Sequence, residues 1–330
     1  MTKLECVIWL FTGACNLSCE HCYAYRFRGA AELSLREKLR LAKEAGELGV
    51  EYVNLSGGEP LAHPHLAPIL EALHEYGVEK SVVTNATLVN DRVLELLSRT
   101  ETYPIVSLDG PREVHERVRG PGTYEAAIRG LKLLLERVGA ASVVAAVSKL
   151  NHGRVHEVAD IAADAGVDGV ALIPVMPVGR ARETGVSVEA GEYLGAVLRA
   201  AERAGERGIR LSLWCTPWAP ILRLGLRSWF CRVANVIDIA PSGDTLLCDV
   251  LDFTTSSVRG KSLSEAYREA LNHPLIKLVA QPPRLPEPCA SCPLAGSCRG
   301  GCFARAFLVK GDFNAGDPLC PKVAQLEVPG

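Results

Sequence analysis

The chain has 330 residues, which is long enough for one large domain with an extensive apolar core and a second, smaller domain. A formal net charge of -2 at pH 7, with no long run of like charges, argues against a surface that binds nucleic acid or membrane. No apolar run approaches the length of a membrane span, and the first residues lack the features of a signal peptide, so we expect a cytoplasmic protein. Twelve cysteines in that reducing compartment favour metal ligation over disulfides.

The first predicted strand, over residues 6–11, leads into a loop that carries three thiols, those of Cys15, Cys19 and Cys22. Three closely spaced thiolates can bind three irons of a cubic iron-sulfur cluster and leave the fourth iron open to another ligand. A zinc site completed by His21 or by a distant residue is the alternative. We favour the cluster because four-ligand zinc sites usually show their ligands as two pairs.

A helix follows this loop, beginning with a capping-box pattern at Ser34 and Glu37. One face of this helix is predicted to hold Leu35, Leu39, Ala42 and Gly46. A buried strand over 52–55 comes next and ends in a turn whose two glycines let the backbone approach a ligand closely.

Strands and helices then alternate regularly along the chain. Further strands are predicted over 80–84, 103–108, 141–147 and 169–174, and helices over 64–76, 91–98, 123–138, 154–165 and 187–207. Near-continuous apolar strands separated by helices predict an α/β fold, with a parallel sheet that right-handed crossovers curve toward a barrel. Active sites in such folds lie at the carboxyl ends of the strands. The polar clusters at these ends are the cysteine loop, residues 56–60, Thr84 with Asn85, Ser107 with Asp109, and residues 148–151.

The Cys-x3-Cys-x2-Cys-aromatic spacing resembles the signature of radical S-adenosylmethionine (SAM) enzymes. The resemblance extends over about residues 4–207 and implies a partial (β/α)6 TIM-like barrel. It also implies that the open iron of a [4Fe-4S] cluster binds SAM, whose one-electron reduction gives methionine and a 5'-deoxyadenosyl radical that takes a hydrogen atom from a substrate.

The same resemblance assigns SAM contacts. Segment 57–60 would bind the methionyl amine, Tyr23 would meet the adenine, and the strand end at Ser107 and Asp109 would lie near the ribose. Arg119 is our candidate for pairing with the SAM carboxylate because a guanidinium can bind it bidentately, with Arg117 as the alternative. The alternative for segment 57–60 is a simple turn, and the alternative for either arginine is a solvated charge at a helix end. The predicted SAM-contacting residues are Tyr23, Gly57, Gly58, Glu59, Pro60, Asn85, Ser107, Asp109 and Arg119.

From Cys231 onward the regular alternation gives way to segments rich in Pro, Gly and Cys, with little periodicity. Such a segment needs stabilisation from something other than a large apolar core, and metal clusters can supply it. We therefore divide the chain into a barrel domain, 1–208, and a loop-rich iron-sulfur domain, 209–330, in which 209–230 is a bridging segment.

Seven cysteines of this region resemble the SPASM extension of radical SAM enzymes, which binds two auxiliary [4Fe-4S] clusters. The resemblance implies that the first auxiliary cluster is held by Cys231, Cys248 and Cys302, and the second by Cys289, Cys292, Cys298 and Cys320. Cys215 is a candidate fourth ligand of the first cluster, with an open iron or a substrate ligand as alternatives. Paired-cysteine zinc knuckles are the alternative for the segment from Cys289 to Cys302.

Two further residues complete the site prediction. Asp249 follows Cys248 directly, and in sulfatase-maturing relatives an aspartate at this place acts as the substrate base. A turn residue is the alternative. Cys6 is left over and is expected to be a small buried apolar side chain.

The resemblance therefore predicts a maturase that modifies a peptide or protein and receives electrons from a low-potential donor of the ferredoxin or flavodoxin kind. The first strand begins near Cys6, so we expect no peptide-binding domain before the barrel, and a separate leader-binding partner or a leader-independent substrate. Modification of a tetrapyrrole or other cofactor, and a non-catalytic iron-sulfur electron carrier, are the alternatives. Arg180 or Arg182, after the sixth strand, is expected to bind a substrate carboxylate in either case.

Overall fold

The computed structural model describes residues 2–167, 169–228, 234–282 and 284–327. Within them the strands join one 11-stranded sheet in the order β11-β10-β9-β1-β2-β3-β4-β5-β6-β7-β8. All neighbouring pairs from β9 to β8 are parallel, whereas β10 is antiparallel to both β9 and β11. The strands are β1 Cys6–Thr12, β2 Tyr52–Gly57, β3 Glu79–Thr84, β4 Tyr103–Ser107, β5 Ser142–Val147, β6 Gly169–Pro174, β7 Arg210–Leu213, β8 Arg227–Ser228, β9 Val236–Ile239, β10 Asp244–Leu246 and β11 Thr254–Ser257.

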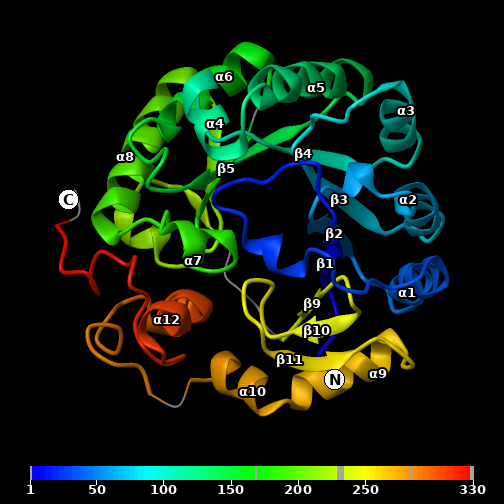
Figure 1. The fold of residues 1–330 in the computed structure, drawn as a ribbon. Coiled ribbons are helices and arrows are strands. Elements are labelled where there is room, and N and C mark those ends of the chain that lie inside the picture. Colours follow the sequence, from blue (N-terminus) through cyan, green and yellow to red (C-terminus); the bar gives the residue numbers. More distant parts are fainter. Residues whose placement is uncertain (1, 168, 229–233, 283, 328–330) are drawn as a thin grey trace.

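Helices form an outer ring around the curved parallel strands, and the sheet does not close (Figure 1). This arrangement confirms the predicted partial barrel with six strand-helix units. The helices are α1 Leu35–Glu47, α2 Leu66–Glu75, α3 Asp91–Arg99, α4 Arg112–Arg119, α5 Thr123–Arg137, α6 Val158–Ala165, α7 Arg180–Thr184, α8 Ala190–Arg207, α9 Leu263–Asn272, α10 Pro274–Ala280, α11 Ala295–Cys298 and α12 Phe303–Lys310. None of the helices in these ranges is both long and apolar enough to cross a lipid bilayer.

The main core lies between the strands and this ring of helices. Trp9, Leu55 and Ile69 are almost completely buried there, and each such side chain contributes roughly 1.5–3 kcal/mol relative to exposure. This core fixes the strands, and therefore the loops that leave their carboxyl ends.

The N-terminus of α1 has the predicted capping box, in which the Ser34 side chain accepts from the Glu37 amide and Glu37 accepts from the Ser34 amide. Of the residues predicted to share one face, Leu35 is 37% exposed, whereas Ala42 is completely buried. The buried residues of α1 are Lys38, Leu41, Ala42 and Ala45. Lys38 can be buried because Nζ of its ammonium group forms an ion pair with Oε2 of Glu32 at 3.1 Å.

The region after residue 233 contains more regular structure than the sequence predicted. β9 pairs with β1 in parallel, from Cys6 opposite Val236 to Trp9 opposite Ile239, and a hairpin of β10 and β11 continues the sheet. Helices α9 to α12 follow, in yellow-orange to red in Figure 1. β7 and β8, within the segment 209–230, also extend the barrel sheet beyond β6.

Candidate functional site

The three thiols of the first loop lie close together after β1. Burial raises the pKa of all three, that of Cys19 to about 11, and the neighbouring Cys22 thiol adds to the rise in Cys15 and Cys19. Three neighbouring thiolates, one buried and two half-buried, are unfavourable without a cation, and iron offsets that cost. The donor set therefore fits a cluster held by Cys15, Cys19 and Cys22.

The glycine turn after β2 runs directly against this loop. The Gly58 amide donates to the Thr12 carbonyl at 2.7 Å, and the Glu59 amide donates to the Ala14 carbonyl at 2.8 Å. A Cβ atom on Gly58 would lie 2.0 Å from the Ala14 oxygen, so only glycine permits this approach. Gly57 has a φ of 109°, which also favours glycine.

Glu59 is 1% exposed, and its carboxylate is occupied by protein groups. The Thr84 hydroxyl donates to Oε1 at 2.7 Å and the Asn85 amide donates to Oε2 at 2.7 Å. Burial raises the pKa of Glu59, although these hydrogen bonds oppose the rise. The carboxylate therefore joins the end of β3 to the glycine turn, and the backbone of this turn is the part that faces the cysteine loop. Pro60 begins a short 3-10 helix that continues from the turn.

Asn85 is the second link between β3 and the cysteine loop. Its Nδ2 donates to Oδ1 of Asn16 at 2.9 Å, and Nδ2 of Asn16 donates in turn to the Thr87 hydroxyl at 2.8 Å. The loop is thus fixed from both β2 and β3.

An ion pair lies at the end of β4. Nε of Arg119, the last residue of α4, contacts Oδ2 of Asp109 at 2.6 Å, and the Ala146 amide donates to the other carboxylate oxygen at 2.9 Å. Burial alone would raise the pKa of Asp109, but Arg119 and, after it, His21 and His115 together lower the pKa to about 2. Arg117 is exposed, whereas Ser107 is buried at the end of β4.

Two histidines lie beside this ion pair, of which the sequence analysis considered only His21, as a ligand in the zinc alternative. Nδ1 of His21 and Nε2 of His115 are buried, and neither has a hydrogen-bond partner within the described chain. Burial lowers the pKa of each imidazole to about 4, so both are neutral at pH 7. The Asp109 amide donates to Nδ1 of His115 at 3.3 Å, which assigns the proton of His115 to Nε2.

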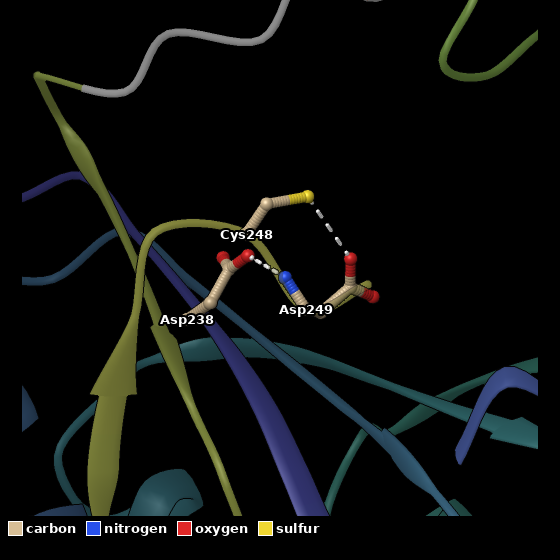
Figure 2. Close-up of side chains that lie close together, drawn as sticks. All are labelled: Asp238, Cys248 and Asp249. Atoms are coloured by element: carbon tan, nitrogen blue, oxygen red, sulfur yellow. Dashed lines mark hydrogen bonds between the residues drawn. The ribbon is translucent and has the colours of Figure 1, made fainter. Parts of the chain in front are cut away.

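A third polar group gathers where β9 and β10 meet the barrel mouth. The Asp249 amide donates to Oδ2 of Asp238 at 2.7 Å, and the Cys248 sulfur lies 3.5 Å from Oδ1 of Asp249 (Figure 2). One ligand atom from each of these three residues lies within 4.8 Å of the other two. Burial raises the pKa of both carboxyl groups, and the charge of Asp249 raises that of Asp238 further.

Tyr23 and Arg26 join the cysteine loop to this group. Nη2 of Arg26 donates to the Asp249 carbonyl at 2.6 Å, and burial followed by the charge of Asp249 raises the pKa of Tyr23. Asp238 was not a predicted site residue, because an acid inside a short strand carries no motif. A buried carboxyl group at such a position can act as a general base.

Four of the C-terminal cysteines line one cavity. Cys289, Cys292, Cys298 and Cys320 face it together with Trp218. Burial raises the pKa of Cys289 to about 11 and that of Cys298 to about 12, and the Cys320 thiol adds to both. The four thiols therefore suit the ligand set of one cluster, in the grouping predicted from the sequence.

The other proposed auxiliary site is described only in part, because Cys231 lies outside the described residues. Cys248 and Cys302 both pack against an apolar cluster that includes Met176 and Ala304. The Cys215 carbonyl accepts from Arg305, three residues after Cys302.

Arg180, one of the two candidates for binding a substrate carboxylate, contacts the cysteine loop. Its Nη2 contacts Oε1 of Glu20 at 2.8 Å, and its amide donates to the Cys22 carbonyl at 3.0 Å. This guanidinium therefore fastens α7 to the cysteine loop. Arg182 is exposed.

Comparisons with known proteins agree with this geometry. Residues 9–160 match the model of the Radical SAM superfamily. The chain is 25% identical over 343 residues to an AdoMet-dependent heme synthase of Methanosarcina barkeri, covering 95% of each chain. It is 29% identical over 335 residues to the mycofactocin maturase MftC of Mycobacterium ulcerans, covering 96% of this chain and 87% of that one.

Solved structures share the fold. Streptococcus suis SuiB bound to its precursor peptide SuiA has a TM-score of 0.77 at 18% identity, covering 98% of this chain and 76% of that chain. The anSMEcpe protein with bound AdoMet and a peptide has a TM-score of 0.77 at 19% identity, covering 97% and 94%.

Proposed function

The chain belongs to the radical SAM superfamily of enzymes, and from this premise we propose that it is a maturase that cleaves SAM reductively and takes a hydrogen atom from a peptide or protein. The observation that carries the proposal is that the loop with the three thiols, which are buried or half-buried, lies against the glycine turn of residues 57–60 at the barrel mouth. A cluster held by Cys15, Cys19 and Cys22 supplies the electron and an open iron for the amino and carboxylate groups of SAM.

The chain's own residues then bind and orient SAM. The backbone of 57–60 meets the methionyl amine, and the guanidinium nitrogens of Arg119 that do not contact Asp109 bind the carboxylate. Asp109 orients Arg119, Ser107 lies toward the ribose, and Tyr23 lies toward the adenine. Asn85 and Glu59 hold the loops in place through the hydrogen bonds described above.

Two auxiliary [4Fe-4S] clusters complete the cofactor set. Cys289, Cys292, Cys298 and Cys320 hold the second, supported by the cavity that they line. The ligands of the first are Cys231, Cys248 and Cys302, with Cys215 as the fourth. Asp249, beside Cys248, acts as the base that takes a proton from the substrate, which its raised pKa supports.

The substrate proposal rests on the relatives. The names of two relatives, mycofactocin maturase and PqqA peptide cyclase, support a peptide substrate. Arg180, whose guanidinium also contacts Glu20, and the exposed Arg182 are the candidates for binding an anionic substrate group. The similarity to heme synthases makes a tetrapyrrole the second candidate.

The proposal also includes an electron donor, a cellular compartment and a division of the chain into domains. A low-potential ferredoxin or flavodoxin-like protein supplies the electrons, and the enzyme works in the cytoplasm. We keep the division into a barrel domain, 1–208, and a cluster domain, 209–330, as a proposal.

The test is anaerobic incubation of the iron-reconstituted, reduced protein with SAM. Formation of 5'-deoxyadenosine is expected, and its absence under strong reduction would favour a non-catalytic electron carrier. Candidate substrates deuterated at single positions then identify the substrate class. Deuterium in 5'-deoxyadenosine from a peptide supports the maturase, whereas deuterium from a porphyrin propionate supports the second candidate.

A further inference from the structure

A buried ion pair joins the parts of the chain that carry the two proposed auxiliary sites. Arg305 in α12 and Asp317 after it have side chains that are 2% and 0% exposed. The contact is bidentate, with Nε of Arg305 2.8 Å from Oδ1 of Asp317 and Nη2 2.5 Å from Oδ2. Such a fork geometry fixes orientation as well as distance.

Asp317 holds a proposed ligand of each cluster. Its Oδ2 accepts from the amide of Cys302, at the first site, at 3.0 Å. Its own carbonyl accepts from the amide of Cys320, at the second site, also at 3.0 Å. A Cβ atom on Gly301 would lie 2.2 Å from that of Asp317, so the chain before Cys302 is packed tightly against the acid.

Arg305 extends the same set of contacts toward the barrel. Its Nη2 donates to the Cys215 carbonyl at 3.0 Å, and its Nη1 lies 3.8 Å from the sulfur of Met176, just beyond β6. Cys215 has a φ of 51°, a left-handed conformation that is unfavourable for a residue with a side chain. The hydrogen bond from Arg305 helps to hold Cys215 in that conformation, beside the N-terminus of α12, where Cys302 is the residue before the first turn.

Stability alone is a poor reason for this arrangement. A buried ion pair is often no more stabilising than apolar residues of similar volume, because both charges must be desolvated. The pair instead links two proposed ligands, because the Asp317 side chain contacts Cys302 and the Arg305 side chain contacts Cys215.

We propose that Arg305 and Asp317 are positioning residues that hold the ligands of both auxiliary clusters as one unit, so that the two clusters are gained and lost together. This inference rests on the proposed function, in which Cys231, Cys248, Cys302 and Cys215 serve one cluster and Cys289, Cys292, Cys298 and Cys320 serve the other.

The test compares iron content and electron paramagnetic resonance (EPR) spectra of the full chain after anaerobic reconstitution. The wild type is expected to hold about twelve irons per chain, four for each of three clusters. Arg305→Met is expected to hold about four and to lose both auxiliary signals. About eight irons, or twelve with unchanged signals, would overturn the inference. A wild type with about four irons would instead refute the proposed auxiliary clusters.

A double variant separates positioning from charge balance. Arg305→Met with Asp317→Leu leaves no unpaired buried charge, so the fold is retained, but the bonds to Cys302 and Cys215 are gone. We expect about four irons and continued SAM cleavage by the barrel cluster. Recovery of twelve irons with native signals would mean that the pair acts only by neutralising charge.

Two more variants complete the design. Cys320→Ala removes a ligand of the second auxiliary cluster only. We expect this variant to lose the EPR signal of the first auxiliary cluster as well, and survival of that signal would contradict the coupling. Arg305→Lys keeps the charge without the fork, and a changed EPR signal from the first cluster is expected, whereas an unchanged signal would count against positioning. Arg203→Met with Asp160→Leu removes a more exposed pair, 2.8 Å apart between α8 and α6, and is the matched control.

Discussion

The guanidinium of Arg119 and the carboxylate of Asp109 form an ion pair at 2.6 Å, and their side chains are only 10% and 0% exposed. The pair lies near Cys19, whose charge would further raise the pKa of Arg119. Arg119 therefore stays protonated and oriented at the edge of the proposed SAM site.

Replacing Arg119 with Met is expected to weaken SAM binding by about 10- to 100-fold, because a charge-assisted hydrogen bond contributes about 1.5–3 kcal/mol. Equilibrium dialysis of reconstituted protein with SAM measures the change. Arg117→Met is the matched control, because Arg117 is exposed on the same helix. Equal losses in both variants would refute the assignment to Arg119.

Cys19→Ala is expected to abolish 5'-deoxyadenosine formation and to leave about eight of about twelve irons, because only the cluster of the first loop loses a ligand. Cys6→Ala is the control, since Cys6 lies in β1 and takes no part in the predicted ligand sets. Iron analysis and product chromatography give both readouts. Survival of SAM cleavage in the Cys19 variant would move the SAM-binding cluster elsewhere.

Gly58→Ala is expected to destabilise the protein and reduce SAM cleavage, because its Cβ would collide with the Ala14 carbonyl and push the glycine turn away from the cysteine loop. A destabilisation of about 1–3 kcal/mol is expected from denaturant unfolding. Gly205→Ala, in α8 where nothing lies within 4 Å of the added Cβ, is expected to be stabilising by about 0.5–1 kcal/mol. A harmless Gly58→Ala would show that the close approach is unimportant.

Glu32 is expected to make the protein acid-sensitive. Burial would raise its pKa, but hydrogen bonds from His63, the Thr12 hydroxyl and the Gly13 amide, and then the charge of Lys38, lower it below its ordinary value of 4.5. A carboxyl group whose pKa is lowered by folding stabilises the native state above that ordinary value, and this stabilisation is lost as the pH falls below it.

Glu32→Gln should therefore reduce the free energy of unfolding by about 1–3 kcal/mol at pH 7, with a smaller difference from the wild type at pH 3. Urea unfolding at both pH values measures this. Glu51→Gln, which removes an exposed pair with Lys3, is the control and should change stability by less than about 1 kcal/mol. A difference that does not shrink in acid would exclude the ion-pair explanation.

The barrel elements could be predicted because their signals are local. The apolar run of β6 and the capping box at Ser34 each lie within a few residues, and the structure has both. The burial of Lys38 in α1 could not be predicted from the sequence. It depends on an ion pair with Glu32 and on the Phe11 ring, over which the ammonium group lies in the folded protein.

Non-local features account for the other differences. β9 is four residues long and contains Asp238, so its sequence alone does not indicate a strand. Its parallel pairing with β1 stabilises it as a strand in the folded protein. The role of Arg180 likewise depends on Glu20, 160 residues earlier. The resemblance to the SPASM extension, by contrast, implied the grouping of four thiols that line one cavity.

The pairing of β1 with β9 has a consequence during synthesis. Cys6 meets its partner Val236 only after most of the polypeptide has left the ribosome. Until then the strand that carries the cysteine loop presents an unsatisfied backbone edge to other nascent chains or to chaperones. Interrupted translation before β9 would therefore yield fragments with an exposed strand edge that is prone to aggregate.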